Sequence, residues 1–172
     1  MKFLIVSDSH GSSRGLGALL EKPIRDLCGV IHLGDGLAEM QNLLSLERYR
    51  HLMLLDVCGN CDVPILLPSP APNLRILERY GRRILLTHGH MGQIAYHPSR
   101  LAALARENGC VAALHGHTHV PAHLIDRGEG GEESPVEILC PGSIARPRGG
   151  SRESYGLADL SEAGLLLSIE EL

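Results

Sequence analysis

Residues 2–35 read KFLIVSDSHGSSRGLGALLEKPIRDLCGVIHLGD, and this stretch decides the fold class. The run 2–7 is short and apolar and stops at a polar cluster, which is typical of a buried strand. Two serines suited to helix capping precede a leucine-rich segment, so we expect a helix over residues 12–27. The run 29–35 repeats the first pattern and predicts a second buried strand.

The same alternation continues through the first third of the chain. Residues 37–48 carry apolar side chains at helical spacing, and residues 51–62 read as a third strand followed by a loop. Strands that alternate with helices are the signature of a parallel sheet covered by helices. The sequence therefore predicts an α/β fold.

The later part of the chain predicts a second sheet. Residues 65–73 form a Pro-rich surface loop, 74–90 a hairpin that turns near Gly81, and 98–108 a helix that Gly109 stops. Further strands are expected in three segments: 110–119, which ends in a histidine-rich loop; 122–143, two strands around a flexible Gly/Glu turn; and 155–172, a last hairpin around 162–164. Because no linker divides the chain, we expect one domain over residues 1–172.

Composition narrows the class of function. The chain has 172 residues, 44% of them hydrophobic, which is enough for a globular domain with its own core. A net charge of −4 with dispersed basic residues argues against a stable nucleic-acid complex, which needs a basic face. The apolar run 3–6 is too short for a secretory signal, and no run reaches transmembrane length. We therefore expect a cytoplasmic protein with no membrane partner.

Five polar clusters share one position: each follows an apolar, strand-like run. They are Asp8-Ser9-His10, Gly34-Asp35, Gly59-Asn60, His88-Gly89-His90 and His117-Thr118-His119. The loops beyond the carboxyl ends of parallel strands converge on one crevice, so these side chains are expected to meet. They offer more nitrogen and oxygen ligands than the four that a tetrahedral zinc takes. The set suits two metal ions, which hold both oxygens of an in-line displacement at phosphorus.

The five clusters, in this order, resemble the motifs of the calcineurin-like metallophosphoesterases, in particular the small single-domain phosphodiesterases of bacteria and archaea. The resemblance covers the whole chain. It implies a four-layer αββα sandwich of two mixed sheets, with the metal site at the carboxyl ends of the strands. It also implies the ligands: Asp8, His10 and His119 for one metal, Asn60, His88 and His117 for the other, and Asp35 between them.

The CxxC of Cys58 and Cys61 has three interpretations: a redox pair, half of a zinc knot, or a loop in which Asn60 is the working residue. The Pro-rich segment that follows is unlike a thioredoxin helix, and a second cysteine pair for zinc is missing. We therefore favour the loop. The resemblance places Cys61 where many relatives carry a histidine that protonates the leaving group. This leaves the general acid unassigned, and activated aryl phosphodiesters are expected to react best. Cys61 itself is expected to touch the substrate pocket as a catalytic residue.

Several further residues are expected near the site. His90 is either a catalytic residue in the pocket or a hydrogen-bonding support, and Asp62 is expected to orient its loop by accepting hydrogen bonds. Gly142 and Ser143 resemble a turn of the family that packs against the metal loops. Arg146 and Arg148 are candidates for phosphate contacts, with solvated surface arginines as the commoner alternative. The Pro-rich segment 64–72 is expected to form one wall of the pocket.

These observations predict a dinuclear metal-dependent phosphodiesterase in which a metal-bound hydroxide attacks phosphorus. The resemblance suggests manganese, and the ligands also admit nickel, zinc, iron or cobalt. Two alternatives stay open. One is a weak or inactive scaffold, like the retromer subunit of the superfamily, and the other is a phosphomonoesterase or nuclease. The expected partner is a small phosphodiester, and the resemblance suggests a homodimer or higher oligomer.

Overall fold

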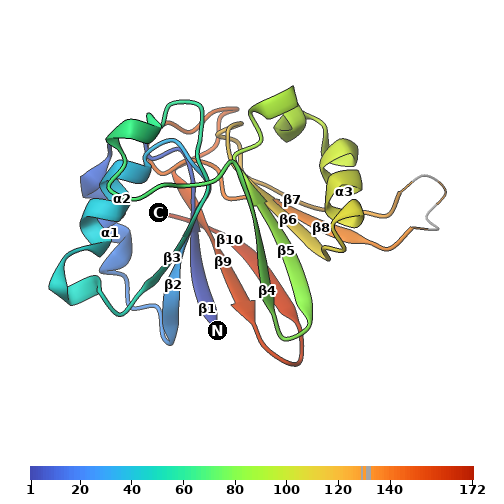
Figure 1. The fold of residues 1–172 in the computed structure, drawn as a ribbon, viewed down its shortest axis with the longest axis horizontal. Helices are drawn as coiled ribbons and strands as arrows, with labels where there is room; N and C mark the ends of the chain where they lie inside the picture. Colours follow the sequence, from blue (N-terminus) through green and yellow to red (C-terminus); the bar gives the residue numbers. More distant parts are fainter. Residues whose placement is uncertain (129, 131–132) are drawn as a thin grey trace.

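Two five-stranded sheets face each other across an apolar interior in the computed structural model, which describes residues 1–128, 130 and 133–172 (Figure 1). The first sheet has the order β10-β9-β1-β2-β3. Its strands are β1 (Lys2–Val6), β2 (Leu27–His32), β3 (Met53–Asp56), β9 (Ser154–Leu160) and β10 (Leu165–Glu171). β1, β2 and β3 pair in parallel, whereas β9 pairs antiparallel with both β1 and β10.

The second sheet has the order β4-β5-β6-β8-β7. Its strands are β4 (Leu74–Arg79), β5 (Arg82–Thr87), β6 (Ala112–His115), β7 (Ala122–Asp126) and β8 (Val136–Cys140). The three central strands are parallel and the two edge strands antiparallel, so both sheets are mixed. The predicted hairpin turn at Gly81 is present between β4 and β5, with positive φ at Tyr80 and Gly81.

Helices cover the outer faces of both sheets. α1 (Ser13–Leu20) and α2 (Leu37–Leu44) pack on the first sheet, and α3 (Pro98–Glu107) packs on the second. Short 3-10 turns are η1 (Glu47–Tyr49), η2 (Pro64–Leu66) and η3 (Met91–Tyr96). Alternation along β1 explains the layers, since Phe3 and Ile5 face the other sheet while Leu4 and Val6 face α1 and α2. The expected four-layer αββα sandwich is confirmed.

Two expectations about elements were wrong. The helix expected over residues 12–27 ends at Leu20, because Pro23 cannot continue it and Leu27 already belongs to β2. The last hairpin does not join the second sheet: β9 pairs with β1 and extends the first. That pairing buries Ala158 and Leu160 of β9 in the core between the sheets. Residues 129 and 131–132 of the expected Gly/Glu turn lie outside the described residues.

The architecture brings the predicted clusters to one end of the molecule. β1, β2, β3, β5 and β6 run in the same sense within their sheets, and each is followed by one of the five clusters. Among the described residues, no helix combines the length and the apolar character needed to cross a membrane.

Candidate metal centre

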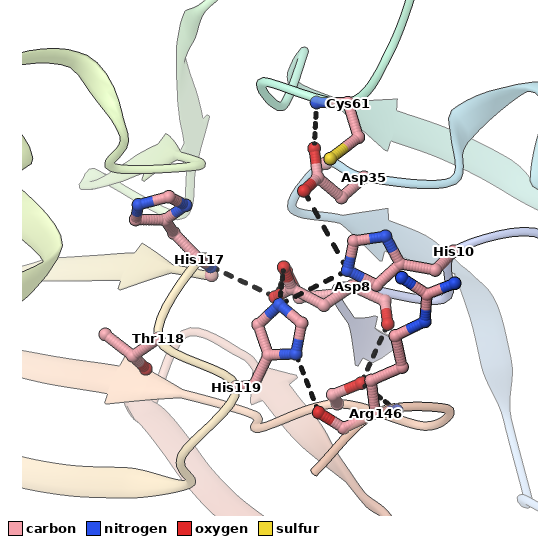
Figure 2. Close-up of polar contacts among 12 residues, drawn as sticks. Asp8, His10, Asp35, Cys61, His117, Thr118, His119 and Arg146 are labelled. Atoms are coloured by element: carbon pink, nitrogen blue, oxygen red, sulfur yellow. Dashed lines mark hydrogen bonds and ion pairs between the residues drawn. The ribbon is translucent and has the colours of Figure 1, made fainter. Parts of the chain in front are cut away.

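The loops after β1, β2 and β6 bring Asp8, His10, Asp35 and His119 together (Figure 2). Five site residues have a left-handed backbone that non-glycine residues rarely adopt: Asp8 (φ 55°), His10 (43°), Asp35 (59°), His117 (70°) and His119 (61°). Each such residue costs of order 1 kcal/mol or more, and such strain clusters at functional sites. The backbone is therefore bent at these positions so that the side chains can meet.

Glycine is required where two of these loops touch. A Cβ on Gly59 would lie 2.1 Å from Asp35 Oδ1, and a Cβ on Gly34 would lie 2.7 Å from His88 Nδ1. The glycines that precede Asp35 and Asn60 in the sequence motifs therefore let the second and third loops approach closely.

The first group of possible ligands is Asp8, His10 and His119. His119 Nε2 lies 3.1 Å from Asp8 Oδ1 and 3.2 Å from His10 Nε2. Asp8 is fully buried. Its Oδ2 accepts hydrogen bonds from Ser7 Oγ and the His117 backbone N–H, whereas Oδ1 has no partner of hydrogen-bond geometry among the described residues. A buried carboxylate oxygen without a donor is costly unless a cation faces it.

The second group contains His88, Asn60 and Asp35. His88 Nδ1 lies 2.7 Å from the Leu33 carbonyl oxygen, which can only accept, so Nδ1 carries the proton. In the neutral ring, Nε2 then presents a lone pair to Asn60 Oδ1 at 3.1 Å and to Asp35 Oδ2 at 3.6 Å. Three acceptors that face one another repel, and a cation bound between them would stabilise this arrangement.

Asp35 lies between the two groups. Its Oδ2 is 3.6 Å from His88 Nε2 and 3.9 Å from His10 Nε2, while Oδ1 accepts the backbone N–H of Cys61. Three sets of side chains have ligand atoms within 4.8 Å of one another: Asp8–His10–His119, His10–Asp35–Cys61 and Asp8–Asp35–His88. Asp8, His10 and Asp35 each belong to two of them, so the three sets form one continuous cluster of donors that fits divalent metal.

Charge couples the residues of the first group. Burial alone would raise the pKa of Asp8, but the contact with His119, the charge of His88 and the Ser7 hydrogen bond hold it below its ordinary value. The Asp8 carboxylate in turn raises the pKa of His119. Burial lowers the pKa of His10, which favours the neutral ring that a metal requires.

His117 is placed differently from the other predicted ligands. Its backbone N–H bonds Asp8, but Figure 2 shows its ring pointing away from Asp8. The ring lies 5.0 Å from the His88 ring and 5.6 Å from the Tyr96 ring, measured between centroids. None of the three sets of ligand atoms includes it, among the described residues. Its role as a metal ligand stays a prediction.

His90 also lies beside the centre. Its ring centroid is 5.3 Å from that of His88, and its Nδ1 is buried without a hydrogen-bond partner among the described residues. Burial, followed by the charge of His88, lowers its pKa. The choice between a catalytic role and a supporting role for His90 stays open.

A pocket of about 420 Å³ opens next to the two groups. His10, Asp35, Cys61 and Arg146 line one part of it. Cys61 therefore faces the pocket, as expected. Burial raises the pKa of its thiol to about 11, with further contributions from the carboxylates of Asp35 and Asp62, so the thiolate is disfavoured. A redox or nucleophilic cysteine needs the opposite shift.

Asp62 accepts backbone hydrogen bonds, as predicted. Its two carboxylate oxygens accept four backbone N–H groups at 2.8–3.0 Å, from Asp35, Gly36, Leu37 and Gly59. One side chain therefore fixes the loop that carries Asp35, the loop that carries Asn60 and the first residue of α2.

Ser143 supports the site from the predicted PGS turn. Its hydroxyl donates to the Asp8 carbonyl oxygen at 2.7 Å and accepts the backbone N–H of Arg146. The Arg146 carbonyl oxygen then lies 2.7 Å from His119 Nδ1 and orients that ring. The sequence indicated a turn here but gave no sign of this backbone contact. Glu39, which also lines the pocket, was not singled out, because on sequence alone it is an ordinary helical glutamate.

The αββα fold with histidines and carboxylates gathered at the strand ends defines a metal-binding phosphoesterase. The family model of the calcineurin-like phosphoesterase superfamily domain matches residues 1–163. The chain belongs to this superfamily.

Known relatives agree with this assignment. The chain is 31% identical over 160 residues to the probable metallophosphoesterase YsnB of Bacillus subtilis (strain 168), covering 93% of this chain and 85% of YsnB. It is 32% identical over 177 residues to the phosphodiesterase YfcE of Escherichia coli (strain K12), covering 92% and 88%. The solved structure of YfcE matches with a TM-score of 0.63 at 25% identity over 92% and 88% of the two chains.

A zinc complex of Vps29 from Entamoeba histolytica shares the fold. Its TM-score is 0.69 at 19% identity, over 99% of this chain and 97% of that one.

Proposed function

We propose that this protein is a dinuclear metal-dependent phosphodiesterase. One observation carries the proposal: His88 Nε2 lies 3.1 Å from Asn60 Oδ1 and 3.6 Å from Asp35 Oδ2, so three possible ligand atoms face one another. The undonated Asp8 Oδ1 gives independent support on the other side of Asp35. The relatives named phosphodiesterase and metallophosphoesterase favour the reaction class.

The cations would be held by the seven residues of the sequence motifs. Asp8, His10 and His119 would hold one, Asn60 and His88 with His117 the other, and Asp35 both. Manganese is our first choice, because the family resemblance suggests it and the oxygen and imidazole ligands admit it. When bound, such ions neutralise charge on a phosphoryl oxygen and lower the pKa of bound water.

The chain itself contributes position and charge. Asp62 and Ser143 hold the ligand loops rigid through backbone hydrogen bonds. The Arg146 side chain reaches beside His10 at the edge of the pocket, where it can meet a phosphate oxygen (Figure 2). The residue that protonates the leaving group stays unassigned, so esters with good leaving groups should react fastest.

The test compares metal-free protein with protein loaded with Mn²⁺. Bis(p-nitrophenyl) phosphate should be hydrolysed only by the loaded protein, and faster than p-nitrophenyl phosphate. Elemental analysis should find about two metal ions per chain, because the site offers two groups of ligands. The variant Asp35→Asn should lose most of the bound metal and the activity. Asp26→Asn, the same change at a carboxylate with an 83% exposed side chain, should keep both.

The scaffold alternative makes the opposite prediction. Vps29 shares the fold at 19% identity, which concerns the fold alone. A scaffold is free to lose ligands, and all seven ligand residues are present in this chain. Full loading with two metal ions and no hydrolysis of either ester would favour the scaffold.

A further inference from the structure

The pocket beside the metal centre has two unlike walls. One wall carries charged and polar groups, with His10 and Asp35 at the metal end and Arg146 and Glu39 near them. The other wall is aliphatic and consists of Ala38, Val63, Leu66 and Leu67. Val63, Leu66 and Leu67 lie on or beside η2, in the segment directly after the proposed ligand Asn60.

The aliphatic wall is exposed to an unusual degree. Leu66 is 70% exposed and Val63 48% exposed, although both are large apolar side chains. Both line the pocket that His10 and Asp35 also line, which distinguishes them from single apolar residues scattered over a surface. The free energy falls when an apolar group covers a surface of this kind and removes it from water.

The groups around the pocket restrict what that apolar occupant is. His10 is the only aromatic ring among the described residues that line it, and this ring is a proposed metal ligand. A nucleobase would therefore find no free ring to stack on. The Glu39 carboxylate opposes a second anionic group. The volume of about 420 Å³ is that of a small-molecule site.

We infer that the substrate is a phosphodiester whose retained substituent, the one that stays on phosphorus, is a short uncharged aliphatic chain seated on Val63, Leu66 and Leu67. The inference rests on the proposed function, because the phosphate must lie at the metal centre for its substituent to reach this wall. Arg146 and the cations hold the anionic phosphate, so the wall beyond them is left for the part of the substrate that carries no charge. We name this wall the aliphatic subsite.

The test uses p-nitrophenyl esters of methyl, propyl and hexyl phosphate with the Mn²⁺-loaded protein. In each reaction a water oxygen bonds phosphorus, the bond to the aryl oxygen breaks, p-nitrophenolate leaves, and the protons of water pass to buffer and product phosphate. Since the leaving group is constant, differences in kcat/KM report the retained chain. Full burial of one methylene would raise kcat/KM about fourfold. Because this subsite is open, we expect kcat/KM to rise about twofold per methylene, or about 30-fold from the methyl to the hexyl ester.

Two variants of the same 3-10 turn locate the effect. In Leu66→Asn, the rise in kcat/KM from the methyl to the hexyl ester should be about fivefold or less, because an amide replaces the apolar surface. Ile65 is 90% exposed and does not line the pocket, so Ile65→Asn should keep both the activity and the full gain. A wild-type kcat/KM that is independent of chain length overturns the inference, and so does an equal loss in the two variants.

A binding measurement separates this inference from the proposed function. Hexyl phosphate should bind the Mn²⁺-loaded protein about 10-fold or more tightly than methyl phosphate in calorimetric titrations, for the same reason. If no ester is hydrolysed but this preference is found, the aliphatic subsite stands and the proposed reaction fails. Equal binding of the two phosphates overturns the subsite, whatever the activity.

Discussion

His32 shows how one buried side chain makes stability depend on pH. The ring is fully buried in β2, where Nδ1 accepts the Gly34 backbone N–H and Nε2 lies 3.3 Å from Ser9 Oγ. Burial lowers its pKa to about 4, although nearby carboxylates oppose the shift.

The sign of the effect follows from proton binding. The unfolded chain takes up a proton on this ring near pH 6.5, whereas the folded chain does so only near pH 4, so stability falls as the pH falls between these values. In chelator-treated protein, the free energy of unfolding of the wild type should fall by about 3 kcal/mol more than that of His32→Gln between pH 7 and pH 4. Urea titrations at three pH values measure this. His51→Gln, at an exposed histidine, should show the same pH dependence of the free energy of unfolding as the wild type. If His32→Gln also showed the wild-type pH dependence, the prediction would be refuted.

Cys61 offers a test of the missing general acid. An imidazole at this position can donate a proton to a leaving oxygen, which the thiol, with its pKa of about 11, does poorly. Cys61→His should therefore raise kcat on phenyl esters by about 10-fold or more relative to p-nitrophenyl esters. The measurement is the slope of log kcat against leaving-group pKa. Cys61→Ser supplies no acid and should keep the wild-type slope; the same slope in all three proteins would count against the idea.

The sequence predicts which residues gather at the site better than it predicts where each ring points. Asp8, Asp35 and His88 follow strands, so topology alone brings them together. The direction of the His117 ring depends on packing against His88 and Tyr96, and Tyr96 comes from a turn that the sequence pattern did not predict. Rotamers of this kind follow from tertiary contacts, which spacing in the sequence does not encode.

At the level of elements, local patterns predicted most strands and helices but not all their partners. β1-α1-β2-α2-β3 follows from apolar periodicity within each segment, and so does the β9–β10 hairpin. The choice between the two sheets for that hairpin depends on contacts about 150 residues away, such as Leu4 with Leu157. A hairpin pattern carries no information about such a distant edge.

α3 is tied to the connection between β7 and β8 by Arg106. Its guanidinium donates to Asp126 Oδ1 at 2.6 Å and to the Ser134 carbonyl oxygen at 2.9 Å, and it pairs with Glu133 at 2.8 Å. The Arg106 hydrogen bond holds the pKa of Asp126 below its ordinary value. One side chain thus links the helix layer to both arms of a long loop.

Removal of this link should destabilise the second sheet. Arg106→Ala should lower the free energy of unfolding by about 2 kcal/mol, because several charge-assisted hydrogen bonds lose their donor. Urea denaturation measures the change. Arg100→Ala removes an exposed arginine from the same helix and should change stability by less than about 0.5 kcal/mol. Equal effects of the two substitutions would contradict the role of Arg106.

On the scale of the whole molecule, the proposed metal centre joins the two sheets. Asp8, His10, Asp35 and Asn60 come from loops of the first sheet, and His88, His117 and His119 come from loops of the second. Ions bound between them would favour the state in which both sheets are folded and docked.

Metal removal should therefore lower thermal stability. At Mn²⁺ about 100-fold above the dissociation constant of each site, each ion contributes about 2.7 kcal/mol, so two ions should raise Tm by about 10–20 °C for a chain of this size. Scanning calorimetry with Mn²⁺ and with chelator measures the shift. Asp35→Asn should show little shift and Asp26→Asn the full shift. A Tm that Mn²⁺ leaves unchanged in the wild type would exclude tight binding to the folded state.

The return of the last hairpin to β1 has a consequence for how the chain folds. β1 is the middle strand of its sheet, and one of its edges is filled only by residues 154–160. A ribosome makes β1 first and β9 near the end, so that edge stays open during most of translation, available to wrong pairing with other chains. Contacts that span so much sequence also slow folding. Chains interrupted before residue 154 should therefore aggregate rather than fold.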